Sequence, residues 1–261
     1  MNILRWLLVV LVLLSVVRCT SPTDPTPPPT IDKLLIGSAT DVGYTAEVYA
    51  NVAIAEGYNP LFVRVLHNGV ALSDAHVTVI PDMDMGTMHH SCPVVQPKDS
   101  IPDSTGLYNC AVFFTMPSAT DWKVGVAIHD HRTDTTVTVH VPVSVSANGN
   151  VRIVQGTAST KFIFTLLSDS WKVGMNDVKF NVYLTTDGFD HTPVDDASLK
   201  MVPTMPSMGH GSMGNVHPTS TGGGWYTGRA NFTMTGDWQL DLTASTIDAP
   251  TLNAKYQIVV H

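Results

Sequence analysis

The stretch Trp122-Lys123-Val124-Gly125-Val126-Ala127-Ile128 is followed, after a polar turn, by Thr136-Val137-Thr138-Val139-His140-Val141. Both stretches are rich in β-branched residues that recur with a period of two, which places every second side chain on the same face of a strand. The same pattern returns at residues 61–67, 76–80, 161–167, 178–185, 226–234, 238–243 and 255–260. After the first twenty residues, no window has the period of an amphipathic helix. The sequence therefore predicts an all-β chain with antiparallel strands.

The composition of the 261-residue chain agrees with a folded β protein. Charged residues are 14% of the chain and apolar residues are 44%, so a substantial core can form. Only Glu47 and Glu56 among the 22 acidic residues are glutamates, so the side chains that fill exposed helix faces are scarce. The formal net charge of −8 repels phosphate backbones, and we expect no nucleic-acid partner.

An internal repeat divides the chain into two copies. Six short landmarks recur in the same order at offsets of 116 to 122 residues. They are Gly57-Tyr58-Asn59 with Gly174-Met175-Asn176, Asp74-Ala75 with Asp196-Ala197, Pro81-Asp82-Met83 with Pro203-Thr204-Met205, Gly106-Leu107-Tyr108 with Gly224-Trp225-Tyr226, Phe114-Thr115-Met116 with Phe232-Thr233-Met234, and Asp121-Trp122 with Asp237-Trp238. We predict two domains of one fold, residues 31–147 and 148–261. With about seven short strands in each, the fold class is two tandem immunoglobulin-like antiparallel β-sandwiches.

The N-terminus has the features of an export signal. Arg5 precedes twelve apolar residues, 6–17, which suit a signal peptide but are too few to cross a bilayer as a helix. The apolar run ends at Arg18-Cys19, and residues 19–30 are rich in proline. This arrangement resembles a bacterial lipoprotein, with a signal peptide at 1–18, a lipid on Cys19 and a stiff tether, although Arg18 replaces the usual small residue. The alternative is an ordinary signal peptide with an incidental cysteine; in both cases we expect export to the cell envelope. A lipid would anchor the chain to a membrane, either at the outer membrane or facing the periplasm.

Two further cysteines, Cys92 and Cys110, remain after export. In an oxidising compartment we expect them to form a disulfide, which would close a loop of about 18 residues and contribute about 3 kcal/mol. The competing role is a thiolate metal ligand at Cys92, which would leave Cys110 unpaired.

The same loop of both copies concentrates methionine and histidine. Seven of the eleven methionines lie at residues 83–88 or 201–213. The first loop offers Met83, Met85, Met88, His89 and His90 as candidate ligands. The second offers Met205, Met208, His210, Met213 and His217. Core packing is the ordinary role of methionine and fits Met116, Met175, Met201 and Met234, but glycines and a proline predict that these loops lie at the surface.

Copper is the metal that this donor set favours. Thioether sulfur is a soft ligand suited to Cu(I), whereas zinc sites prefer cysteine, histidine and carboxylate. The sequence therefore predicts a copper-binding protein that handles copper in the envelope or delivers it to an acceptor protein. The alternative is a non-catalytic structural or interaction module, whose methionines contact another envelope protein as an apolar patch.

The other histidines carry weaker signals. His129 and His131 lie on one face of a strand end, which suits either an accessory Cu(II) site or solvated residues at a turn. We assign no role to His67, His76, His140, His191 or His261. No nucleophile elbow, phosphate loop or zinc-protease pattern is present in the sequence, so we expect no enzymatic activity.

The second copy resembles a known family. Gly174, Asn176, the run Met205-Pro206-Ser207-Met208-Gly209-His210, Gly224, Tyr226, Met234, Gly236 and Trp238 are similar to the pattern of YtkA-like and FixH-like domains. The first copy is a divergent match, because its loop lacks Pro-Ser-Met-Gly-His and two extra residues precede Trp122. The resemblance implies an immunoglobulin-like sandwich and an association with copper handling or with the assembly of copper-containing respiratory oxidases.

Overall fold

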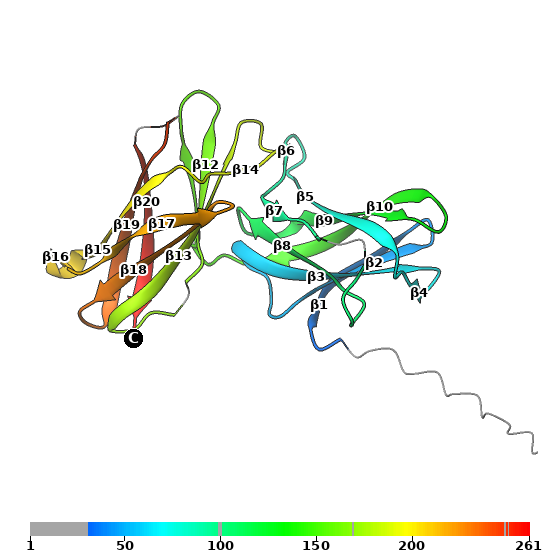
Figure 1. Cartoon of the computed structure of the whole chain (residues 1–261), viewed down its shortest axis with the longest axis horizontal. Coiled ribbons are helices and arrows are strands. Elements are labelled where there is room, and N and C mark those ends of the chain that lie inside the picture. The colour runs from blue at the N-terminus through cyan, green and yellow to red at the C-terminus, as the bar shows by residue number, and fades with distance from the viewer. Residues whose placement is uncertain (1–30, 99–100, 169, 248, 250) are drawn as a thin grey trace, which may run out of the picture. The chain divides into compact units, whose positions relative to one another are not determined.

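A computed structural model describes residues 31–98, 101–168, 170–247, 249 and 251–261. The predicted signal peptide, the proline-rich tether and the lipidation site Cys19 lie outside the described residues. Within the described part of the chain, no helix is both long and apolar enough to cross a bilayer. Its elements are strands, apart from one short 3-10 helix (Figure 1).

Each half of the chain contributes ten strands. Those of the first half are β1 (Leu34–Asp41), β2 (Tyr44–Ala50), β3 (Gly57–His67), β4 (Val70–Ala71), β5 (Ala75–Asp84), β6 (His89–His90), β7 (Val94–Val95), β8 (Tyr108–Phe114), β9 (Ser118–Asp130) and β10 (Thr135–Val145). Those of the second half, with the 3-10 helix η1, are β11 (Val151–Gln155), β12 (Lys161–Leu166), β13 (Gly174–Thr185), β14 (Thr192–Pro193), β15 (Ser198–Met205), η1 (Pro206–Met208), β16 (His210–Gly211), β17 (Val216–Gly222), β18 (Trp225–Phe232), β19 (Gly236–Ser245) and β20 (Leu252–Val260).

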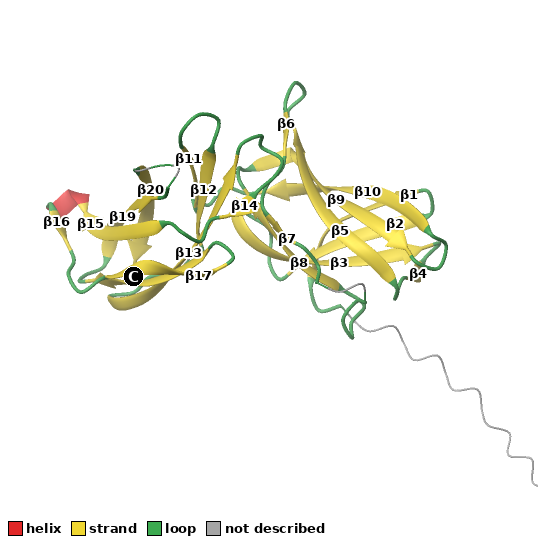
Figure 2. Cartoon of the chain, turned by 45° about the horizontal axis from the view of Figure 1, so that its top comes forward, coloured by secondary structure: helices red, strands yellow, loops and turns green. Residues whose placement is uncertain are grey.

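The two halves have the same sheet topology. The first half has one sheet in the order β1-β2-β3-β8-β7, with β4 beside β3, and a second sheet in the order β10-β9-β5-β6. The second half repeats these orders as β11-β12-β13-β18-β17, with β14 beside β13, and β16-β15-β19-β20 (Figure 2). The named strands pair antiparallel. The predicted fold class, an all-β chain with two antiparallel sandwiches, is confirmed.

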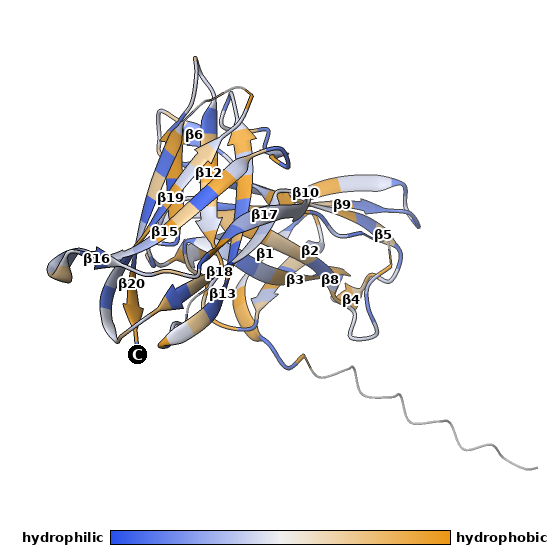
Figure 3. Ribbon diagram, turned by 60° about the vertical axis from the view of Figure 1, so that its left-hand side comes forward, coloured by the Kyte–Doolittle hydropathy of each residue, from blue (hydrophilic) through white to orange (hydrophobic). Residues whose placement is uncertain are grey.

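Each sandwich encloses its own apolar core. Along β5 and β20, buried side chains alternate with side chains that are partly or fully exposed. Figure 3 shows hydrophobic and hydrophilic residues interspersed along the strands. Trp122 and Trp238 are fully buried at equivalent positions, and their rings contact Phe114 and Phe232 edge to face at 5.2 Å in both cases. Large aromatic rings in these arrangements contribute much of a core's stability.

The landmarks of the repeat have structural roles. Asn59 and Asn176 are buried, and each side-chain amide bonds to the backbone of the preceding loop: to Ala55 and Gly57 in the first half, and to Lys172 and Gly174 in the second. The indole N–H groups of Trp122 and Trp238 donate to the carbonyls of Met116 and Met234 at 2.9 and 3.0 Å. The landmarks therefore satisfy buried backbone groups, which any loop of this fold must do.

The two halves pack against each other within one compact unit, residues 31–261. Phe113, Val151, Ile163 and Tyr183 form a small buried cluster, with Trp225 packed against it. Tyr58 contacts both Phe113 and Trp225. The connection between β10 and β11 is short, and the carboxylate of Glu56 accepts the backbone N–H groups of Asn148 and Gly149 at 3.3 and 3.0 Å.

The predicted disulfide between Cys92 and Cys110 is wrong, because both are free thiols. β7 and β8 pair with Val94 opposite Val112, and the Phe113 N–H donates to the Pro93 carbonyl. Continued by two residues, this register places Cys92 opposite Phe114. Four residues of strand, about 13 Å, then separate it from Cys110, whereas a disulfide needs Cα atoms within about 7 Å. Burial raises the pKa of both thiols, that of Cys110 to about 12. Neither thiol is therefore a ready metal ligand.

Candidate metal centre

The first methionine loop is the turn between β5 and β6. The Asp84 carboxylate accepts the Gly86 N–H at 2.8 Å, a bond that lowers the pKa of Asp84, and Gly86 has a φ of +82°. The Met85 N–H donates to the Met88 carbonyl at 3.0 Å and closes the turn. Met85 and Met88 are 45% and 61% exposed, so both thioethers are accessible from solvent.

The two histidines of this loop differ in their surroundings. Both ring nitrogens of His89 face carboxylates, Nδ1 facing Asp82 at 3.4 Å and Nε2 facing Asp84 at 3.5 Å. The ring of His90 instead stands edge to face against Trp122 at 5.7 Å. Its Nε2 atom is buried and has no hydrogen-bond partner. Burial also lowers the pKa of His90, which favours the neutral imidazole that binds metals.

A cavity of about 390 Å³ lies beside this loop. Three thioethers and three imidazoles are among the groups that line it: Met85, Met88, Met116, His89, His90 and His191. Charged side chains of both signs, Lys161 and Asp187, also reach its wall. The cavity therefore gathers thioether and imidazole side chains, and this donor set fits a soft cation.

His191 reaches the cavity from the second half of the chain. The loop between β13 and β14 turns at Asp187, whose carboxylate accepts the N–H groups of Phe189 and Asp190 at 2.8 and 2.9 Å. Gly188 has a φ of +82°, and its carbonyl accepts the N–H of Ser91, next to His90, at 2.8 Å. Burial lowers the pKa of His191. This loop is thus fixed against the strand that carries His90.

The second methionine loop has the same framework but is more open. Met205 pairs with His210 between β15 and β16, as Met83 pairs with His90 in the first half. The ring of His210 stands edge to face against Trp238 at 5.7 Å, which repeats the contact of His90. η1 and a left-handed Gly209 form the turn, and Met208 and Met213 are 60% and 87% exposed. His217 lies apart, on β17, where its Nδ1 accepts the Met201 N–H at 3.2 Å.

Three methionines lie in other places than predicted. Met83 and Met205 belong to the two cores and are not loop ligands, because each is the last inward-facing residue of its strand. Met175, expected in the core, is instead exposed on β13, since Asn176 takes the inward position. The exposed thioethers of the candidate ligand set are therefore those of Met85, Met88, Met208 and Met213.

Sequence reasoning missed two residues of the cavity. Met116 was expected only in the core; it packs against that core and also lines the cavity. His191 had been given no role, because its approach depends on contacts between residues 100 positions apart in the chain. No local pattern around His191 could have signalled this contact.

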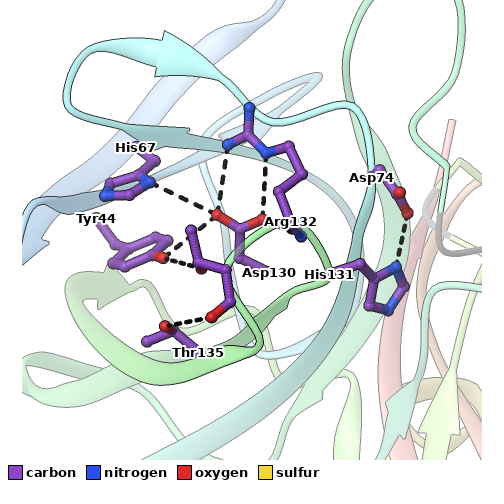
Figure 4. A network of polar contacts seen from close by, with 8 residues as sticks. Tyr44, His67, Asp74, Asp130, His131, Arg132 and Thr135 are labelled. Carbon is purple, nitrogen blue, oxygen red and sulfur yellow. Dashed lines mark hydrogen bonds and ion pairs between the residues drawn. The ribbon is translucent and has the colours of Figure 1, made fainter.

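A polar network centred on Asp130 lies at the end of β9, and Figure 4 shows His131 next to it, paired with Asp74. Asp130 is fully buried, and its carboxylate accepts bonds from Tyr44 and Arg132 and faces His67 at 3.5 Å. His131 bonds to Asp74 at 2.6 Å, and its ring lies 5.2 Å from that of His129. Within the described residues, no three histidine, cysteine or acidic side chains are grouped so that they could hold a metal, either here or around the cavity, where a site would also need the methionines. This end of the sandwich is therefore explained by structural pairing.

The chain is thus a tandem β-sandwich protein, and its two methionine loops carry thioether and imidazole side chains. Residues 156–243 match the model of the YtkA-like family, so this part of the second half is similar to YtkA-like domains. The match covers about a third of the chain. Assignment of the first half to the same family, and the likeness to FixH, stay predictions.

Several solved structures show a distant likeness. The conserved domain protein from Bacillus anthracis is 7% identical, with 87% of this chain and 90% of that chain covered and a TM-score of 0.31. The D00-D0 domain of intimin is 16% identical, with 83% and 99% covered and a TM-score of 0.27. A chain described as pT26-6p is 10% identical, with 88% and 66% covered and a TM-score of 0.26. These TM-scores carry no argument about function, and a comparison with curated proteins finds no match.

Proposed function

We propose that this chain is an exported copper-binding protein that takes up Cu(I) through its methionine and histidine loops. Copper is the cargo, and the chain stores it in the cell envelope or delivers it to an acceptor protein. The proposed membrane anchor rests on the leader and Cys19, which lie outside the described residues.

One observation carries the proposal. Met85 and Met88, which are 45% and 61% exposed, line one cavity together with Met116 and three histidines, His89, His90 and His191. An exposed thioether gains little from solvent and is open to oxidation, so two of them in one short turn need a reason. A soft monovalent cation supplies one, because sulfur and imidazole together favour Cu(I) over zinc, calcium or magnesium.

The second loop supports the same function in a different way. Met208 and Met213 are more exposed, and His210 is held by Trp238 as His90 is by Trp122. We propose that this open loop exchanges Cu(I) with the surroundings, while the cavity beside the first loop holds the ion more tightly.

The test is an anaerobic titration of the full exported chain with Cu(I) against a chromophoric chelator. The variant Met85→Ala/Met88→Ala should bind Cu(I) at least about tenfold more weakly, since loss of even supporting groups costs this much at metal sites. Met208→Ala/Met213→Ala is the matched control and should keep the tight site.

Two results would contradict the proposal. One is a wild-type chain that takes no Cu(I) from the chelator. The other is a Met85→Ala/Met88→Ala variant that binds Cu(I) as tightly as wild type. Either result would leave the methionines as an apolar contact patch for another envelope protein, which is the alternative function.

A further inference from the structure

We infer that His191, from the second half of the chain, is a ligand of the copper site formed by the first methionine loop. This inference rests on the proposed function and adds to it that the Cu(I) site is built by both sandwiches.

The position of His191 follows from a loop that is fixed at several points. Asp187 and Gly188 set the turn, and the bond from the Ser91 N–H to the Gly188 carbonyl ties it to the first half at 2.8 Å. A Cβ atom at position 188 would lie 3.7 Å from the Cβ of His90, so the two backbones are in close contact there. His191 follows three residues later and lines the same cavity as His90.

The side chains around the cavity are suited to bind a soft cation together with His191. Nε2 of His90 is a buried imidazole nitrogen without a partner, and a buried polar atom of this kind normally finds one. His89 is less suited to the role, because both its nitrogens already face carboxylates. A cation held by His90, His191 and the thioethers of Met85, Met88 or Met116 would have soft or intermediate ligands throughout.

The experiment compares His191→Ala, His191→Met and wild type in the full chain, with His76→Ala as a control on an exposed strand position. In the anaerobic Cu(I) titration, His191→Ala should bind roughly tenfold or more weakly. His191→Met should recover much of the affinity, because it returns a soft donor at the same position. His76→Ala should bind as wild type does.

A second readout separates a ligand from a residue that only supports the loop. Ag(I), a redox-inert soft cation, should shift the ring nitrogen signals of both His90 and His191 in nitrogen-15 NMR spectra. Unchanged His191 signals, or equal Cu(I) affinity in wild type and His191→Ala, would overturn the inference and leave the proposed function standing. A wild-type chain that binds neither Cu(I) nor Ag(I) would instead overturn the proposed function itself.

Discussion

The two methionine loops share a framework and differ in their surroundings. In both, an inward methionine ends a strand, a histidine pairs opposite it, and that histidine stands edge to face on a buried tryptophan. Around the first loop, the β13–β14 connection closes a cavity that Met85 and Met88 line. The second loop leaves Met208 and Met213 largely in solvent.

The comparison separates two contributions. The repeated residues build the scaffold of both sandwiches, whereas the cavity beside the first loop also needs residues of the second half. The repeated residues Trp122, Trp238, Asn59 and Asn176 build the sandwiches and position the loops. The loop thioethers lie outside these landmarks. Loops of like origin can therefore acquire different metal affinity without any change in the scaffold.

The largest expected effect tests whether the scaffolds are equivalent. Trp122→Ala and Trp238→Ala should each lower the free energy of unfolding of the copper-free chain by about 4 kcal/mol, since both remove a fully buried ring and an indole hydrogen bond. Urea denaturation followed by circular dichroism measures this. A loss in one variant that is less than half the loss in the other would break the equivalence.

A smaller effect on stability should distinguish the two halves at the end of each sandwich where β9 or β19 ends, and it should depend on pH. The Arg132 guanidinium, followed by the Tyr44 hydroxyl, holds the pKa of Asp130 below its usual value near 3.9. This carboxylate therefore stabilises the fold at pH values above about 4, and its contribution is lost as the pH falls through the lowered pKa. In the second half, the turn after β19 is closed by the Thr246 hydroxyl, which does not titrate in this range.

Asp130→Asn should thus lower stability by about 2 kcal/mol at pH 7, and the difference should shrink as the pH falls below about 4. Denaturation curves at a series of pH values measure it. Asp134→Asn changes a carboxylate whose side chain is 95% exposed and is the control. A loss of stability in Asp130→Asn that is the same at pH 3 and pH 7 would contradict the assigned role of this carboxylate.

The smallest effect concerns the loops themselves. Dilute hydrogen peroxide should oxidise Met213, Met208 and Met88 several-fold faster than the buried Met83 and Met205, because attack on the thioether needs access. One equivalent of Ag(I) should then protect Met85 and Met88 more than Met213. Peptide mass spectrometry gives the rates, and fast oxidation of Met83 or Met205 would refute their placement in the cores.

The sequence predicted the fold well because both signals, the period of two along each strand and the repeat of short motifs, can be recognised without knowing how the strands pair. It identified Trp122 and Trp238 as equivalent positions of the repeat. It misplaced Met83 and Met205, because where a strand ends and its loop begins depends on pairing with β9 and β19. It also paired Cys92 with Cys110 on their number alone, whereas the register of β7 and β8 decides how far apart they lie.

The candidate site was harder to predict than the fold. The clustering of methionine selected Met85 and Met88 as candidates, and both line the cavity. His191 was not, because its contribution depends on how two sandwiches pack, and the aromatic contacts of Tyr58, Phe113 and Trp225 that set this packing have no periodic signature.

The short connection between β10 and β11, tied down by Glu56, has a consequence for assembly. Two modules joined by a short linker meet at an effective concentration of millimolar order, whatever the amount of protein present. Under the inference that His191 is a ligand, a single copy of this chain brings donors from both sandwiches to one ion without dimerising. An insertion into this connection that left both folds intact would lower the effective concentration of the donors of one sandwich near those of the other.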